Sequence, residues 1–298
     1  MCKWFITVAN GLILTISLLA LFSFFAVSAE APAVRIVFSG QTKGGTWDLW
    51  LASSDGVYLQ QAMVTPDTDE KTPVLSPNRK YVAYSTSGGE LCLYNLYDKN
   101  TSQLSLPTAG RAAWPAWDPN AFAIYYVNIL MGKGPDEGQV WRYDIKSGKA
   151  QKVADDPEVE GWPAVNHEGV LLFTTWAQSQ VGHVSMMMAQ DQKPRILWDQ
   201  SLNLSGAAFL RDGRIAAIAG DGKVQRVILL KNDGKLDHEF NVSGASGRPV
   251  VYENELLLTR IEGGMAGIHV MDLTTGKTHP WMKAASKDLV QLRDPDYR

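Results

Sequence analysis

The chain has 298 residues, of which 45% are hydrophobic and 20% charged, with 26 glycines and 14 prolines. This composition is typical of a globular protein with a large core and excludes an intrinsically disordered chain. The formal net charge of −3 provides no basic field for nucleic acid or for an anionic membrane surface, so neither is expected as a partner.

Residues 1–29 predict export. Lys3 precedes an uncharged apolar run from Trp4 to Val27, and Val27 and Ala29 supply small residues before Glu30. This order matches a secretory signal peptide with an A-x-A-like cleavage site, which leaves residues 30–298 as the mature domain. The run is also long enough to cross a bilayer, so an uncleaved segment would anchor the protein in the membrane. We expect a periplasmic or secreted protein.

Cys92 is the one cysteine that follows this segment. A disulfide framework is therefore excluded, and the exported domain must be stabilised by packing alone. Cys92 lies in the alternating segment "ELCLYNL", which predicts a buried position in a strand rather than a reactive thiol.

A repeating unit occupies the rest of the chain. Each unit has an anchor position, usually a proline, just before the turn that ends a short strand, and successive anchors are 42, 48, 44 and 42 residues apart. Four-stranded propeller blades have this period of about 40 to 45 residues. The anchors are Pro73, Pro115, Pro163, Ala207 and Pro249.

Each unit predicts four strands in a fixed order. The short anchor strand comes first, as in "WPAW" at 114–117, where we expect Trp117 to pack as a wedge between blades and Pro119 with Asn120 to form the turn. Two strands rich in β-branched and aromatic residues follow, and a shorter polar strand ends the unit after a tight turn. The second strands are 81–86, 122–127, 170–175, 214–220 and 255–261; the third are 90–96, 139–145, 183–189, 224–230 and 267–273.

The two ends of the chain complement each other. Residues 35–62 supply a second, third and fourth strand with no first strand before them, and residues 288–298 supply a lone first strand, with Gln291 in the anchor position. Together they would complete a sixth blade and close the ring, which removes exposed sheet edges. The sequence therefore predicts an all-β fold, a six-bladed β-propeller of four-stranded blades closed by joining the N- and C-terminal strands.

These blades resemble the propeller of the TolB family, whose WD-like repeats carry a "P-x-W-S-P-D-G" turn followed by "IAF" and "IYVMD" strands. The matching segments are "PVLSPNRKYVAYS", "PAWDPNAFAIYYV", "PAVNHEGVLLFTT" and "IHVMDLTTGK", and the resemblance covers roughly residues 33–298. It implies the six-bladed fold, and we expect the α/β domain that precedes the TolB propeller to be absent. Similar blades also occur in prolyl oligopeptidases and polysaccharide lyases, so the resemblance does not fix the function.

A binding site is expected at one end of the ring. The loops between blades and those between second and third strands emerge on the same face, around the mouth of the central channel. Trp114 and Trp162 immediately precede anchor prolines, with Arg111 and Arg248 nearby, and such side chains are enriched at interface hot spots. The alternative is that both tryptophans pack beneath the loops. We predict a non-enzymatic module that binds an envelope or extracellular protein, or an oligosaccharide, without a cofactor.

The competing hypothesis is a carbohydrate-active enzyme, similar to a polysaccharide lyase, with its site in the channel. The chain has no G-x-S-x-G nucleophile elbow, and its five histidines show no zinc-site spacing, so neither a catalytic residue nor a metal ligand is assigned. His183, at the start of a third strand, would be the first candidate for a channel metal. The acidic clusters at 67–70 and 155–160 lack the calcium-loop pattern and are expected to be solvated loops.

Overall fold

A computed structural model describes residues 34–107, 110–130, 138–153, 159–176, 182–188, 191, 193–199, 203–220, 224–282 and 288–298. The predicted signal segment lies outside these ranges. The described residues form twenty-four strands and no helix. A search of these same ranges for an apolar helix that could cross a membrane accordingly finds none.

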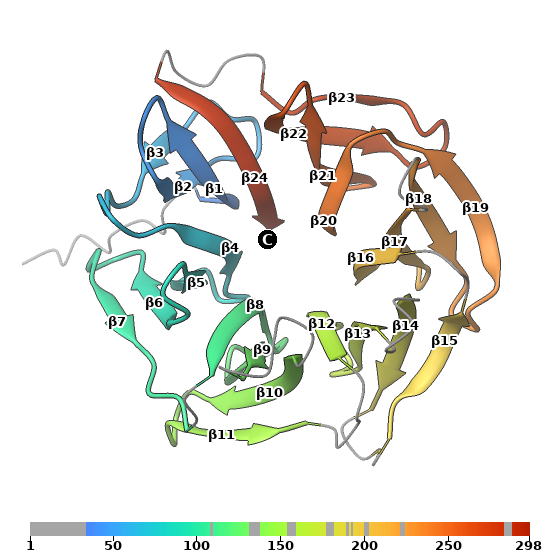
Figure 1. The fold of residues 1–298 in the computed structure, drawn as a ribbon, viewed down its shortest axis with the longest axis horizontal. Coiled ribbons are helices and arrows are strands. Elements are labelled where there is room, and N and C mark those ends of the chain that lie inside the picture. The colour runs from blue at the N-terminus through green and yellow to red at the C-terminus, as the bar shows by residue number, and fades with distance from the viewer. Residues whose placement is uncertain are drawn as a thin grey trace, which may run out of the picture. The chain divides into compact units, whose positions relative to one another are not determined.

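The strands form six four-stranded antiparallel sheets arranged as the blades of a ring (Figure 1). The predicted six-bladed propeller is thereby confirmed. In order from the ring centre outward, blade 1 contains β24 (Leu289–Tyr297), β1 (Ile36–Thr42), β2 (Trp47–Ala52) and β3 (Leu59–Gln61), and blade 2 contains β4 (Glu70–Leu75), β5 (Tyr81–Thr86), β6 (Leu91–Asn95) and β7 (Thr101–Gln103). Blade 3 contains β8 (Arg111–Trp117), β9 (Ala123–Ile129), β10 (Gly138–Asp144) and β11 (Lys149–Lys152), and blade 4 contains β12 (Val159–Val165), β13 (Leu171–Trp176), β14 (Gly182–Met187) and β15 (Arg195–Asp199). Blade 5 contains β16 (Asn203–Phe209), β17 (Ile215–Gly220), β18 (Gln225–Leu230) and β19 (Leu236–Asn241), and blade 6 contains β20 (Ala245–Tyr252), β21 (Glu255–Glu262), β22 (Met265–Asp272) and β23 (Thr278–Pro280).

The ring closes through strands from both ends of the described chain. β24 pairs antiparallel with β1, and the backbone N–H of Arg298 donates to the carbonyl of Arg35 at 3.0 Å. The predicted closure is confirmed, but the anchor position assigned to Gln291 is wrong. β24 has two register irregularities, and the one between Arg293 and Asp296 contains an X-Pro pair like the bulges of blades 2, 3 and 4, which places Pro295 in the anchor position. Extrapolation of the 42-residue spacing failed here because the step from Pro249 to Pro295 is 46 residues (295−249=46).

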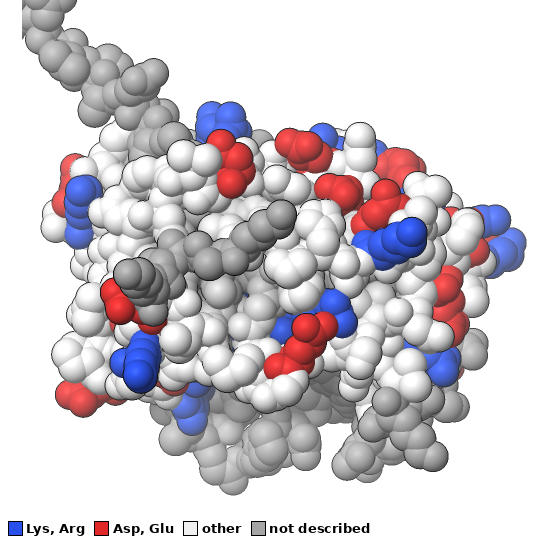
Figure 2. All heavy atoms as spheres, turned by 90° about the horizontal axis from the view of Figure 1, so that it is seen from above, with Lys and Arg blue, Asp and Glu red and all other residues white. Residues whose placement is uncertain are grey.

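The core lies between neighbouring blades. Trp117 of blade 3 is buried, and its indole N–H donates to the carbonyl of Val74 in blade 2 at 3.1 Å. The predicted wedge is confirmed, as is the buried position of Cys92 in β6. A hydrogen bond to a backbone carbonyl satisfies the polar end of the ring while its apolar surface fills the gap between the sheets. On the outer surface, acidic and basic side chains are interspersed (Figure 2).

A β-bulge interrupts the innermost strand of each blade, on the wall of the channel. In four blades the bulge contains an X-Pro pair whose first residue has a left-handed backbone, with φ near 50°. Proline cannot donate to the strand ladder, so a bulge is where an inner strand tolerates it. The four left-handed residues are Thr72, Trp114, Trp162 and Asp294. They all line the channel, so the bulges determine which side chains enter it.

Candidate functional site

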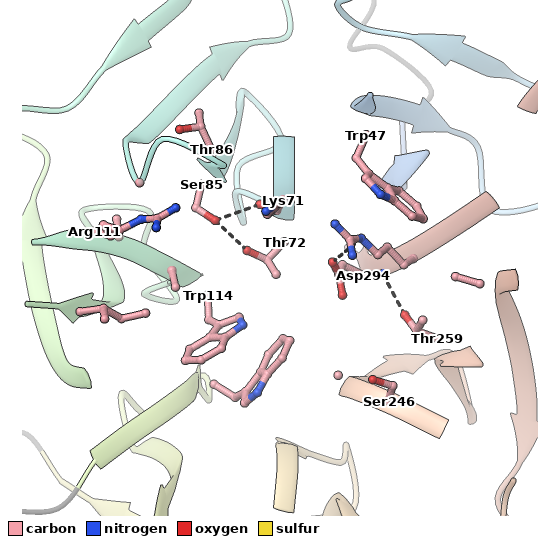
Figure 3. Close-up of a pocket in the computed structure, with 18 of the residues that line it drawn as sticks. Trp47, Lys71, Thr72, Ser85, Thr86, Arg111, Trp114, Ser246, Thr259 and Asp294 are labelled. Atoms are coloured by element: carbon pink, nitrogen blue, oxygen red, sulfur yellow. Dashed lines mark hydrogen bonds and ion pairs between the residues drawn. The ribbon is translucent and has the colours of Figure 1, made fainter. Parts of the chain in front are cut away.

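A cavity of about 760 Å³, which we call the mouth, opens at the loop-lined end of the channel. The described residues that line it come from five blades, and Figure 3 shows side chains from several blades converging on it. The size is within the range of ligand-binding clefts in proteins. Its lining includes Trp47, Lys71, Thr72, Ser85, Thr86, Arg111, Trp114, Trp162, Ser246, Thr259, Gln291, Arg293 and Asp294.

Two stacked indoles form the floor of the mouth. The rings of Trp114 and Trp162 have centroids 4.9 Å apart and planes inclined by 26°. Both side chains remain partly exposed. Both also line a constriction of about 10 Å³ deeper in the channel, together with Pro73, Pro115 and Pro295. The indole pair therefore presents an apolar surface at the bottom of a water-accessible cavity.

The charged groups of the mouth are largely compensated by their neighbours. The guanidinium of Arg293 lies 4.0 Å from the centroid of the Trp47 ring and 3.5 Å from the Asp294 carboxylate. The Lys71 ammonium lies 3.6 Å from the Asp69 carboxylate. Burial raises the pKa of Asp294, against the opposing effect of the nearby Arg293 charge. The mouth thus combines charges already engaged within the protein with aromatic surface.

Hydroxyl groups and an exposed arginine complete the lining. The hydroxyls of Thr72 and Ser85 are 3.2 Å apart, and the Thr259 hydroxyl accepts a hydrogen bond from the Asp294 backbone N–H at 2.8 Å (Figure 3). Arg111 is exposed and donates to the carbonyl of Ser87. These groups can exchange hydrogen bonds with a polar ligand above the indole floor.

The structure brings together three of the four residues singled out in the sequence. Arg111, Trp114 and Trp162 line the mouth, whereas Arg248 lies beyond it, at the constriction. The Arg248 side chain is mostly buried, 3.3 Å from the Asp296 carboxylate, and it donates to the carbonyl of Pro163 at 3.1 Å. It thereby links three inner strands.

Sequence reasoning did not single out Trp47, Arg293 or Asp294 as lining residues. Asp294 was recoverable, because Asp294 precedes Pro295 just as the predicted tryptophans precede their prolines. No comparable local signal marks Trp47 of β2 and Arg293 of β24. These two residues are far apart in the sequence and come into contact only in the folded ring.

The acidic clusters at 67–70 and 155–160 were expected to be solvated loops, and this is wrong for one residue of each cluster. Glu70 is 2% exposed and Glu160 fully buried, because both lie on innermost strands rather than in the loops before them. Glu160 accepts a hydrogen bond from the Val140 backbone N–H at 2.5 Å. Burial, reinforced by the nearby Asp48 and Asp69, raises the pKa of Glu70 to about 7. Residues 155–158 of the second cluster lie outside the described residues.

In the described part of the chain, no three His, Cys, Asp or Glu side chains gather as a metal-binding group. His183 is nearly buried at the start of β14, and its Nδ1 lies 3.1 Å from the Asp199 carboxylate. No role in the mouth is assigned to it.

Comparison with protein families and with curated proteins finds no match. Solved structures share the fold. TolB from Acinetobacter baumannii superposes with a TM-score of 0.73 at 14% identity, over 89% of this chain and 66% of that one. A chain of a nidogen/laminin complex superposes with a TM-score of 0.70 at 12% identity, over 88% of this chain and 97% of that one. An oligogalacturonate lyase in complex with manganese superposes with a TM-score of 0.61 at 9% identity, over 82% of this chain and 78% of that one. The fold resemblance to TolB-type propellers is therefore confirmed.

Proposed function

We propose that this protein is exported and acts as a non-enzymatic binding module, recognising a protein segment or an oligosaccharide through the mouth. The observation that carries the proposal is the stacked pair of Trp114 and Trp162 at the floor of an open cavity. The signal-like residues 1–29 support export. The periplasm or the cell exterior is the proposed location.

The lining chemistry supports binding. Indole faces stack on sugar rings or on apolar side chains, and such aromatic surfaces dominate interface energetics. The hydroxyls of Thr72, Ser85 and Thr259 provide both donors and acceptors for orientation. A ligand that combines an apolar face with polar edges fits this arrangement, and both a peptide and an oligosaccharide have that character.

The fold shared with a lyase keeps enzymatic action on an oligosaccharide as the second candidate. An enzyme of that kind would be expected to converge several ionisable groups on the reacting atoms. In the described lining of the mouth, aromatic and hydroxyl groups predominate, and the Asp294 carboxylate is engaged with Arg293. This composition favours the binding module.

The test is substitution of Trp162 by alanine. Loss of the stacked ring should weaken partner binding about tenfold or more. The free energy of unfolding should fall by only about 1 kcal/mol, the value of an aromatic pair. The protein purified after expression of the full chain would be used for crosslinking capture from the envelope fraction of its source and for glycan-array binding.

Phe122→Ala provides the matched control, because Phe122 is an aromatic residue that is 68% exposed in the turn after β8 and does not line the mouth. Equal capture by wild type and Trp162→Ala would contradict the proposal. A large loss of stability in Trp162→Ala would assign the ring to the core instead. Glycan binding accompanied by turnover would establish the second candidate.

A further inference from the structure

A second cavity, of about 810 Å³, lies at the opposite end of the channel and is called here the rear cavity. It extends from Tyr297 and Arg298, at the ring centre where β24 ends, to Arg195 in the peripheral strand β15 (Figure 1). The constriction of about 10 Å³ lies between it and the mouth, lined in part by the same Trp114 and Trp162. The two cavities can therefore hold different ligands.

Two arginines of the rear cavity carry uncompensated charge. Arg195 and Arg211 are exposed, and neither has a carboxylate within ion-pair distance among the described residues. The neighbouring Asp212 is already engaged by Arg214 at 2.8 Å. In the mouth, Lys71 and Arg293 have acidic partners, and Arg111 donates to a backbone carbonyl instead.

The two other arginines that line the rear cavity share a carboxylate. Asp296 lies 3.3 Å from Arg248 and 3.9 Å from Arg298, and its second oxygen also accepts a hydrogen bond from the Leu75 backbone. His167 lies 3.9 Å from the exposed Glu168, a contact that is an ion pair only when the imidazole is protonated. The positive charge left for a ligand therefore comes from Arg195 and Arg211.

Apolar side chains form the wall between these charges. Met186, Phe209 and Tyr297 are half-buried, and Met188 is 44% exposed. An inorganic anion would use the guanidinium groups but leave this wall in contact with water. A ligand complementary to the rear cavity must combine carboxylates with aliphatic or aromatic groups.

We propose that the rear cavity binds an acidic peptide segment, with carboxylates on Arg195 and Arg211 and apolar side chains against Phe209 and Met186. The elongated lining, from the ring centre to β15, suits an extended chain with more than one acidic residue. This binding is separate from recognition at the mouth.

The experiment measures fluorescence anisotropy of a labelled peptide, Glu-Leu-Glu-Phe-Glu-Leu with blocked ends, added to the protein purified after expression of the full chain. Two further peptides replace every glutamate by glutamine or by lysine. The charge-reversed protein is Arg195→Glu with Arg211→Glu. Lys235→Glu is the matched control, because Lys235 is exposed, is paired with Asp233 and does not line the cavity.

We expect charge reversal at both arginines to lower the affinity for the acidic peptide about tenfold or more. The wild-type protein should bind the glutamine peptide with a comparable loss of affinity, and it should not bind the lysine peptide. Added salt should weaken binding, and Lys235→Glu and Trp162→Ala should leave it unchanged. No binding of the acidic peptide at about 1 mM would overturn the proposal. Equal affinity for the glutamine peptide, or for the charge-reversed protein, would also overturn it. A loss confined to Trp162→Ala would instead place the peptide in the mouth.

Discussion

At the scale of single residues, Glu70 is a buried acid in the first position of β4, at the boundary between blades 1 and 2. Its Oε2 atom is buried without a hydrogen-bond partner among the described residues. The same position brings it near Asp48, another buried acid, whose pKa burial also raises. Stability of the ring should therefore depend on the protonation of this interface.

Substitution of Glu70 by glutamine should stabilise the protein at pH 8. The folded-state pKa of about 7 lies above the ordinary glutamate value of 4.5, so the folded state holds the proton more tightly than the unfolded state. Wild-type stability should consequently fall as the pH rises from 4.5 through 7, a change of up to about 3 kcal/mol. Glutamine removes this dependence while keeping the side-chain shape.

Urea unfolding of both proteins between pH 5 and pH 8 measures this effect. The stability gain from Glu70→Gln should be largest at pH 8 and shrink towards pH 5. Glu168→Gln, at a residue whose side chain is 68% exposed, should show little change across the same range. A gain that does not vary with pH would refute the assigned protonation.

Residue positions in the site were predictable only where local sequence marks them. Trp114 and Trp162 were found because each precedes an anchor proline, and the bulge places both in the mouth. Arg248 also precedes an anchor proline, yet its side chain points into the constriction, since in β20 the left-handed residue is Gly247. Burial of Glu70 was missed because adjacent acidic residues imitate a solvated loop until the strand boundary is known.

At the scale of elements, the bulges of the inner strands impose backbone strain. Thr72 is β-branched and has φ of 48°, a region that disfavours such residues. The strain is maintained because Pro73 cannot pair in the ladder, so the strand must bulge there. The same device recurs in four blades, which indicates that it shapes the channel rather than arising by accident at one position.

Comparing glycine with alanine at position 72 tests this strain. Both variants lose the hydroxyl contact with Ser85, so their difference reports the backbone. Glycine at φ of 48° should be more stable than alanine by about 0.5 to 1 kcal/mol, in spite of its greater unfolded-state entropy. Chemical denaturation gives the difference.

Thr86 of β5, which lacks a positive φ, is the reference position. There alanine should be the more stable of the two by about 0.5 to 1 kcal/mol. The inversion of sign between the two positions is the expected result. Greater stability of alanine at both positions would show that Thr72 is not strained.

Strand order was largely readable from the sequence, because each blade repeats the same alternation of anchor, hydrophobic pair and polar edge. The period failed at the last step, where the anchors Pro249 and Pro295 are 46 residues apart (295−249=46) and not 42. Pro295 was overlooked in favour of Gln291 because the spacing was extrapolated, although the X-Pro signature itself was present at Asp294. The rear cavity was not predicted, because turns of similar composition on that face gave no sign that Arg195 and Arg211 would line one cavity.

At the scale of the whole molecule, the ring depends on a noncovalent closure. β24 supplies the inner strand of blade 1 and brings Asp296, which accepts from the Leu75 backbone in blade 2 and pairs with Arg248 of blade 6. Loss of β24 would expose the edge of β1 and leave Arg248 buried without its carboxylate. An unpaired edge and an uncompensated buried charge both oppose a stable monomer.

Deletion of residues 289–298 should therefore abolish cooperative unfolding and produce self-association, whereas deletion of Arg298 alone should not.

A circular permutant distinguishes loss of the strand from loss of chain continuity. Because Arg298 and Arg35 are already hydrogen-bonded, a short linker can join residues 298 and 34, with new ends between Thr274 and Thr275 in an exposed turn. This permutant should remain monomeric and fold cooperatively, since all six sheets stay complete and permutation at such sites is usually tolerated. Sedimentation and thermal unfolding measure both properties. A stable monomeric deletion variant would show that packing between blades, without strand closure, is sufficient to hold the ring.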